Sequence, residues 1–246
     1  GLRGDILWCW GGNGYGQLGM GDTITRTTLV QVGSGWTAIA SGRFFQCGIH
    51  EGRLSCFGQD ADGQLGRGVW RDRRTPHRVG QEMDWTAVSA AQRSACGIRG
   101  GELWCWGWNT GGEVGDGTIV SSYVPKRIGA ATDWFALGGR LGTHQCGLRG
   151  TAGQGTLWCW GDNGSGQLGD GTTVRKTSPV QIGTANDWTE VATGELSTCG
   201  RRGGALFCWG SRDQGQIGVF PYPANSTVPV QVGTGTDWSK LSLSRM

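Results

Sequence analysis

The sequence is poor in the residues on which most catalytic and metal sites depend. Only three histidines occur, His50, His77 and His144, and none lies in a motif with a nucleophile or a carboxylate. No Gly-x-Ser-x-Gly motif or phosphate loop precedes a helical pattern. Metal sites and active sites need convergent polar groups. We therefore predict a protein that is not an enzyme and that carries no cofactor and no metal.

Long apolar runs and an excess of charge are also missing. No run approaches the ~18 apolar residues that a membrane-spanning helix needs. The 22 basic and 19 acidic residues leave a net charge of +3, which is too small to indicate a nucleic-acid partner. The one dense basic run, Arg71-Asp72-Arg73-Arg74, is expected to be a solvated loop. We expect neither a membrane span nor a nucleic-acid partner.

Glycine, tryptophan and cysteine are abundant instead, with 49, 14 and 9 residues, and they recur in one repeated unit. Each unit has a Leu-Trp-Cys-Trp-like segment, at residues 7–10, 54–57, 103–106, 157–160 and 206–209. A Gly-Gln-Leu-Gly type turn follows, starting at Gly16, Gly63, Gly112, Gly166 and Gly215. Each unit then ends in a tryptophan, at Trp36, Trp85, Trp134, Trp188 and Trp238. A period of about 50 residues with several short strands is typical of a propeller blade.

The repeats predict an all-β fold, a β-propeller of five repeats that forms a single domain over residues 1–246. The last segment, residues 239–245, is expected to join residues 1–10 in one blade, because a shared blade would leave no open sheet edge. In this interpretation the ring closes as five blades. The alternative is that the five repeats are part of a seven-bladed propeller.

The cysteines are spaced for pairing across hairpins. A two-residue turn at Glu51-Gly52 places Cys47 opposite Cys56. The same spacing argument gives the further pairs Cys96–Cys105, Cys146–Cys159 and Cys199–Cys208. Opposed cysteines have the separation that a disulfide needs, so we predict four disulfides and an oxidising compartment. The alternative is that they are buried thiols that fill the space between blades.

Cys9 is the odd cysteine of the nine. Its partner in the hairpin would lie just before Gly1. Two interpretations stay open, a free buried thiol or a natural chain that extends beyond Gly1 and carries a partner. The first residue is glycine rather than methionine, so a secretory leader that has been removed is compatible with the sequence.

The repeated unit, Cys-Gly-Leu-Arg followed by Leu-Trp-Cys-Trp-Gly-x-Asn-x-x-Gly-Gln-Leu-Gly-x-Gly-Thr, resembles the repeats of the regulator of chromosome condensation family. The resemblance covers essentially the whole chain and is closest to the Trp- and Cys-rich bacterial members. It implies a β-propeller, usually of seven blades, that presents loops to partners. Members with known roles include an exchange factor, a photoreceptor and an enzyme inhibitor, so function has to be argued from the loops.

A unique site is expected where the repeats differ, in the segment before each hairpin cysteine. These segments fall near one rim around the central axis, and Arg, Phe and His side chains there suit partner binding. Trp70 and Trp108 are the tryptophans outside the repeated positions. The predicted rim residues are Arg43, Phe44, Phe45, Trp70, Arg71, Arg93, Trp108, Arg140, His144, Glu195 and Arg245. For Phe44 and Phe45 the alternative is a place in the core.

We therefore predict a non-enzymatic scaffold whose variable rim loops contact a macromolecular partner, in the first place another protein. A second hypothesis is a carbohydrate-binding propeller with aromatic pockets between the blades, although blade packing uses the tryptophans first. The predicted disulfides favour an extracellular or cell-surface location.

Overall fold

The computed structural model describes residues 1–139, 142–218 and 225–243, and every regular element in this part of the chain is a β-strand. No membrane-crossing helix is found within these residue ranges. In chain order the strands are β1 (Leu2–Arg3), β2 (Ile6–Gly11), β3 (Arg26–Gly33), β4 (Trp36–Ser41), β5 (Phe45–His50), β6 (Arg53–Gly58), β7 (Arg73–Arg78), β8 (Trp85–Ala90), β9 (Ser94–Arg99), β10 (Glu102–Gly107), β11 (Ser122–Arg127), β12 (Trp134–Leu137), β13 (His144–Thr151), β14 (Gln154–Gly161), β15 (Lys176–Gln181), β16 (Trp188–Thr193), β17 (Ser197–Arg202), β18 (Ala205–Gly210) and β19 (Ser226–Gln231).

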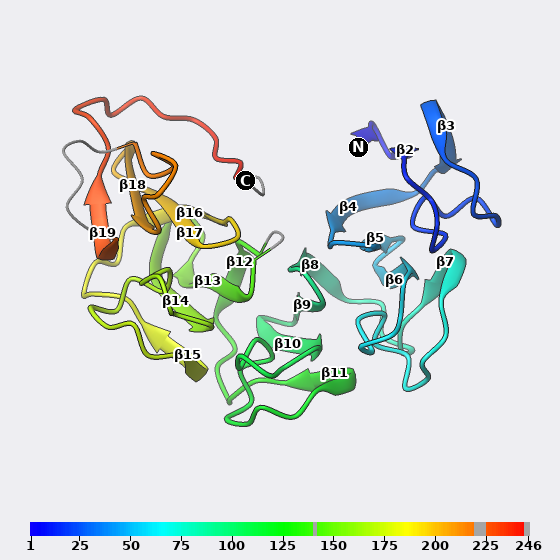
Figure 1. The fold of residues 1–246 in the computed structure, drawn as a ribbon, viewed down its shortest axis with the longest axis horizontal. Helices are drawn as coiled ribbons and strands as arrows, with labels where there is room; N and C mark the ends of the chain where they lie inside the picture. The colour runs from blue at the N-terminus through cyan, green and yellow to red at the C-terminus, as the bar shows by residue number, and fades with distance from the viewer. Residues whose placement is uncertain (140–141, 219–224, 244–246) are drawn as a thin grey trace.

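The strands form consecutive antiparallel blades. Blade 1 comprises β1–β3, blade 2 β4–β7, blade 3 β8–β11, blade 4 β12–β15 and blade 5 β16–β19. A single bridge between Gly155 and Trp188 joins blades 4 and 5 into one sheet. In Figure 1 the blades follow one another round an arc, from the blue blade 1 through green to the orange blade 5. This arrangement confirms the predicted all-β propeller.

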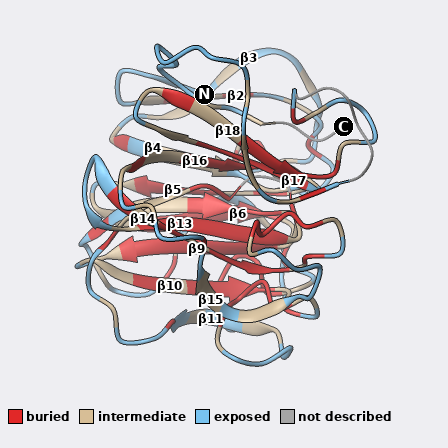
Figure 2. Ribbon diagram, turned by 90° about the vertical axis from the view of Figure 1, so that its left-hand side faces the viewer, coloured by how far each residue is buried: buried red, intermediate tan, exposed pale blue. Residues whose placement is uncertain are grey.

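The first strands of blades 2 to 5 face the axis of the arc. They line a central cavity of about 620 Å³, to which Gly1 and Leu241 also contribute. Figure 2 shows the other consequence of this stacking, buried strands in the middle of the molecule and exposed loops at the strand ends. Loops at the strand ends, together with the outer strand of each blade, are therefore accessible to a partner.

Tryptophans tie blades 3 and 4 each to the blade before it. The buried Trp106 of β10 donates its indole N–H to the Gln64 carbonyl of blade 2 at 2.9 Å. Trp160 of β14 does the same to the Glu113 carbonyl of blade 3, also at 2.9 Å. Trp106 packs edge-on against Trp85, with ring centroids 6.3 Å apart. Because neighbouring blades cover both faces of these strands, the repeated segment is almost continuously buried, as in a sheet covered on both sides.

The two ends of the described chain do not share a blade. Blade 1 contains β1, β2 and β3 and takes no strand from residues 235–243. Leu241 and Leu243 pack instead against a buried cluster of blade 5 that includes Cys208 and Ile217. The predicted closure with residues 1–10 is therefore corrected for the described residues, and five-blade closure is not confirmed. The apolar side chains of the last segment find their partners on the blade that precedes them.

The predicted disulfides are confirmed. The structure contains Cys47–Cys56, Cys96–Cys105, Cys146–Cys159 and Cys199–Cys208. Cys47 faces Cys56 and Ile49 faces Leu54 across the β5–β6 hairpin, which is the expected register. Among the described residues Cys9 is free and buried. Burial raises the pKa of its thiol, which makes it a weak nucleophile near neutral pH.

Candidate functional site

Blades 2 to 5 each direct two connections to the same end of the propeller, from the first strand to the second and from the third strand to the fourth. In blade 2 they are residues 42–44 and 59–72, and in three-stranded blade 1 the connection of β2 to β3 takes the same place. We call this end the long-loop end. The opposite end carries the tight hairpin turns, such as Glu51-Gly52, and the connections between blades. The predicted rim residues that the structure describes lie on or beside the loops of the long-loop end, because alternate strands run in opposite directions.

Backbone hydrogen bonds join the loops nearest the axis into a continuous rim. The Arg43 N–H donates to the Gln92 carbonyl at 3.2 Å, and the Gln92 N–H donates to the Gly142 carbonyl at 3.1 Å. These contacts link blades 2, 3 and 4. The rim side chains are therefore held on one rigid surface rather than on independent loops.

Aromatic and arginine side chains gather on this rim. The exposed Arg43 guanidinium lies 5.0 Å from the ring centroid of Phe44. Phe44 in turn contacts Tyr15 of the blade 1 loop, with centroids 5.1 Å apart. Stacked Arg and aromatic groups that remain partly exposed are the side chains most often found as anchors of protein interfaces.

A second aromatic–arginine pair lies between blades 2 and 3. The Arg93 guanidinium is 5.5 Å from the Trp108 ring and 3.6 Å from the Asp62 carboxylate. Arg93 and Trp108 border a small cavity of about 210 Å³, which Glu113 also lines. The Glu113 carboxylate accepts a hydrogen bond from the Gly111 N–H at 2.8 Å. Burial raises the pKa of Glu113 to about 7, and the nearby Asp162 adds to this effect.

Trp70 anchors an exposed apolar patch on the β6–β7 loop. Its side chain is 69% exposed and meets Tyr123 of blade 3 edge-on at 5.1 Å. Val69 and Val124 beside them are also exposed. Arg71 follows Trp70 and is exposed too. The basic run is a solvated loop only at Arg71 and Asp72, because Arg73 and Arg74 begin β7, where Arg73 pairs with Gly58 of β6 and is half-buried. An exposed aromatic side chain next to an arginine is typical of a surface that binds another protein.

Other predicted rim residues have different places. Phe45 is 1% exposed and belongs to the core of blades 2 and 3, so the core alternative holds for it. His144 is also fully buried and is not available to a partner. Glu195 is half-buried beside a cavity of about 520 Å³ at the long-loop end of blade 5. Arg140 and Arg245 lie outside the described residues.

The environment of His144 explains its burial. Thr198 donates its only hydroxyl proton to the Gln167 carbonyl at 2.7 Å, so its oxygen can only accept from His144 Nε2, 2.7 Å away. His144 is therefore neutral and protonated on Nε2. Burial lowers its pKa to about 4. The imidazole serves to pack blade 4 against blade 5.

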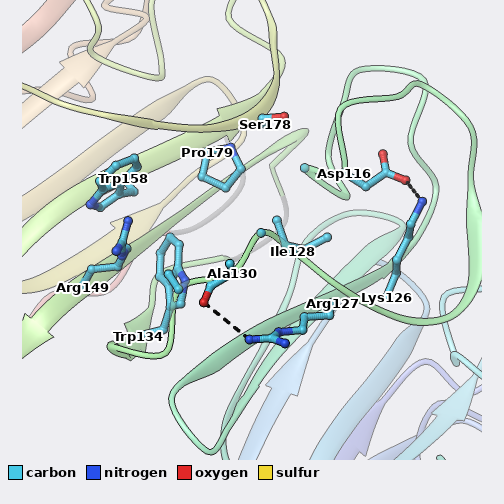
Figure 3. Close-up of a pocket in the computed structure, with 13 residues that line it drawn as sticks. Asp116, Lys126, Arg127, Ile128, Ala130, Trp134, Arg149, Trp158, Ser178 and Pro179 are labelled. Atoms are coloured by element: carbon cyan, nitrogen blue, oxygen red, sulfur yellow. Dashed lines mark hydrogen bonds and ion pairs between the residues drawn. The ribbon is translucent and has the colours of Figure 1, made fainter.

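The outer edge of the propeller carries pockets between neighbouring blades. The outer pocket of blades 3 and 4 has a volume of about 590 Å³. Figure 3 shows the Arg149 side chain beside Trp158 and Trp134 in this pocket. The guanidinium carbon lies 4.6 Å from the Trp158 ring and 5.6 Å from the Trp134 ring. Across the pocket, the Asp116 carboxylate pairs with the Lys126 ammonium at 2.5 Å.

The same stack recurs in neighbouring blades and was not predicted from the sequence. Arg99 covers Trp104 at 4.7 Å in blade 3, and Arg202 covers Phe207 at 5.3 Å in blade 5. The signal for it was present, because each arginine stands three residues after a hairpin cysteine in the repeat. Among the described residues no cluster of His, Cys, Asp and Glu side chains has the arrangement of a metal site.

Comparison with known proteins agrees with this geometry. The profile of the Regulator of chromosome condensation (RCC1) repeat matches residues 100–135 and 154–200. A search of curated protein sequences found no match. Among solved structures, human WBSCR16 is similar with 21% identity and a TM-score of 0.79 over 91% of this chain and 60% of that one.

Yeast RCC1 (Prp20), crystallised with Kap60 bound, is similar with 17% identity and a TM-score of 0.80 over 94% of this chain and 57% of that one. Prp20p from Saccharomyces cerevisiae, whose binding to Gsp1p and histones is described with its structure, has 18% identity and a TM-score of 0.73 over 85% of this chain and 54% of that one. The chain therefore spans less than two thirds of the length of these structures. At such identities the likeness establishes the fold.

Proposed function

Because this chain carries repeats of the regulator of chromosome condensation family and has the fold of its propellers, we propose that it is a non-enzymatic scaffold that binds another protein. The binding surface is the long-loop end. The propeller acts as one domain across residues 1–246, and the partner contacts the loops in which the repeats differ.

The main support is the position of the exposed aromatic and arginine side chains. Arg43 with Phe44, Arg93 with Trp108, and Trp70 with Tyr123 all lie at the long-loop end, on the neighbouring blades 2 and 3. Interface hot spots are enriched in Trp, Tyr and Arg and cluster on rigid surfaces. The hydrogen-bonded rim reduces the conformational entropy that binding would otherwise cost.

The solved structures of similar fold add support of a second kind. Yeast RCC1 (Prp20) binds Kap60, and Prp20p has binding properties toward Gsp1p and histones. Those partners are proteins. Protein recognition is therefore the function class that the fold favours for this chain, while the identity of the partner depends on its own loops.

The carbohydrate alternative has less support. The aromatic faces between blades, which would have to stack on sugars, are covered by Arg99, Arg149 and Arg202. Four disulfides within hairpins are what an oxidising compartment permits, so we place the protein outside the cell or on its surface.

The proposal can be tested by affinity capture from the organism's own extracts with variants of the long-loop end. We expect Trp70→Ala and Arg43→Ala each to reduce capture of the same protein by at least about tenfold, the loss typical of an interface hot spot. Met83→Ala is the matched control, because Met83 is an exposed apolar residue on the connection at the opposite end.

Capture that is unchanged in both rim variants would show that the surface is wrong. Equal losses in the Met83→Ala control would show the same, because the effect would then not depend on the long-loop end. Each variant should first give the wild-type thermal unfolding curve, so that a loss of capture reports the surface and not the fold.

A further inference from the structure

The outer pockets between blades are built from equivalent positions, and they differ in charge. In the outer pocket of blades 3 and 4, Asp116 accepts a hydrogen bond from the buried Asn109 and pairs with Lys126. Blade 4 repeats this arrangement with Asp170, which accepts from Asn163 and pairs with Lys176 at 3.0 Å. The cation of these sites is neutralised by an acid of the same blade.

Blade 2 reverses this arrangement. Asp60 stands at the position of Asn109, and Arg67 stands at the position of Asp116. Arg67 is therefore a cation at the position where blades 3 and 4 have the acid that neutralises the pocket. The outer pocket of blades 2 and 3 has a volume of about 430 Å³, and its basic lining residues are Arg67, His77, Arg78 and Arg99.

The acids near this pocket offset only part of its positive charge. Glu82 lines the pocket, but its carboxylate is engaged by Arg99 at 3.0 Å. Asp60 is buried, and burial raises its pKa to about 6. Burial lowers the pKa of His77, and the nearby Arg67 and Arg73 lower it further.

Several arginine N–H groups here lack an acceptor. In the part of the chain that the structure describes, Arg67 Nη1, Arg73 Nε and Arg78 Nε are buried atoms without a hydrogen-bond partner. Arg78 uses Nη2 to donate to the Gln81 carbonyl. Arg67 and Arg78 both line the pocket, and guanidinium groups in such a place donate charge-assisted hydrogen bonds to an anion that enters it.

We propose that the outer pocket of blades 2 and 3 binds a tetrahedral oxyanion, a phosphate or sulfate group, held by Arg67 and Arg78. Guanidinium groups match the geometry of such anions and form charge-assisted hydrogen bonds with them. Trp104 and Pro125 supply an apolar wall of the same pocket. The pocket is large enough for the anion to be carried on a small organic group. The pocket borders the Trp70 patch, because Val124 belongs to both, but anion binding does not depend on the proposed partner.

Isothermal titration calorimetry tests this directly. The wild-type protein is titrated with inorganic phosphate, sulfate, O-phosphotyrosine and tyrosine in a chloride buffer of constant ionic strength. We expect one saturable site for the anions and none for tyrosine. Equal affinity for phosphate and phosphotyrosine supports a free anion as the ligand. Tighter binding of phosphotyrosine supports an anion that is attached to an organic group. Absence of saturable binding for all three anions would overturn the proposal.

Variants locate the site. Arg67→Asp restores the acid found in blades 3 and 4, and we expect it to weaken anion binding by at least about tenfold. Arg78→Gln, a milder change, should also weaken binding and keeps the test valid if Arg67→Asp does not fold. Arg3→Asp makes the same charge change at an exposed position of blade 1 and should bind as wild type. Wild-type affinity in both pocket variants, or an equal loss in Arg3→Asp, would contradict the assignment.

Discussion

One side chain of the repeated Gly-Gln-Leu-Gly turn has the same task in every blade. Its terminal oxygen accepts a hydrogen bond from the backbone N–H two residues before it. The five donors and acceptors are Tyr15 and Gln17, Asp62 and Gln64, Gly111 and Glu113, Ser165 and Gln167, and Gln214 and Gln216. A neutral amide does this without cost. In blade 3 the position holds Glu113, whose carboxylate is buried and prefers to keep its proton.

Replacing Glu113 with glutamine should therefore stabilise the protein in a pH-dependent way. The folded pKa of Glu113 is about 7, above the ordinary value of 4.5, so the folded state binds more protons between these two values. Stability of the wild type falls as the pH rises through this window. We expect the Glu113→Gln variant to gain up to about 3 kcal/mol in free energy of unfolding at pH 8, shrinking to near zero at pH 4. Urea unfolding at several pH values measures this.

The reverse change provides the control. Gln167→Glu places a carboxyl group at the same position of blade 4, so this variant should lose stability at pH 8 and recover it at pH 4. A gain in Glu113→Gln that does not change with pH would contradict the argument, because the effect would then come from packing and not from the buried charge.

The type of a residue alone did not predict whether its side chain is buried or exposed. Phe45 and His144 were predicted on the rim with Arg43, yet both are buried. The sequence shows that these segments vary between repeats, but the neighbouring blade decides which of their side chains it covers. His144 is covered because Thr198 of the next blade accepts its Nε2–H. A contact of that kind, between residues far apart in the chain, leaves no periodic pattern in the sequence.

At the scale of the element, the hairpin was the part that the sequence predicted best. Cys96 faces Cys105 across β9 and β10, as the two-residue turn at Gly100-Gly101 requires. Both glycines have positive φ, of 52° and 74°, which a side chain would strain. Strand register follows from turn length and the alternation of side chains. The arginine stacks on Trp104 and Trp158 were missed because they depend on how one strand lies beside the next.

Removing one hairpin disulfide should weaken the fold by a moderate amount. Cys96 and Cys105 are separated by only 9 residues, so the cross-link restricts a short loop of the unfolded chain. The chain-entropy estimate for such a loop is about 2.5 kcal/mol. We expect the double variant Cys96→Ala, Cys105→Ala to lose about this much free energy of unfolding in urea, with the far-ultraviolet spectrum of a β-protein retained.

Cys9→Ala is the matched control, because Cys9 is a buried cysteine in the equivalent strand without a disulfide. It removes a similar side chain but no cross-link, and should cost clearly less. In wild-type protein unfolded without reductant, thiol titration should find one reactive group. A count of nine would show that no disulfide had formed.

At the scale of the whole molecule, the tryptophan pattern of the middle blades changes at the two ends. Trp106 and Trp160 are buried between blades, whereas Trp10, at the equivalent position of blade 1, is 57% exposed. Trp238, which follows blade 5, is 42% exposed. The repeat length was sufficient to predict a propeller. It did not predict how the two ends of the chain are arranged. The repeated residues make contacts between neighbouring blades, and the repeat pattern does not show whether the first and last blades meet.

This difference should be visible in fluorescence quenching by iodide. Trp10→Phe should lower the fraction of tryptophan emission that iodide can quench, because it removes an exposed indole. Trp160→Phe removes a buried indole and should leave the quenched emission unchanged while lowering the protected part. If the two variants changed the quenched fraction alike, blade 1 would have to be covered in solution.

The indole bonds of Trp106 and Trp160 each point to the blade before them, so they couple a blade to its neighbour. A molecule of this kind responds to mechanical load in steps. If the chain were pulled from its two termini, an outer blade would detach while the others held, and extension would rise by one repeat at a time. The hairpin disulfides would keep part of each repeat from extending, so every step would be shorter than the repeat itself. The propeller would then yield to tension gradually instead of failing at once.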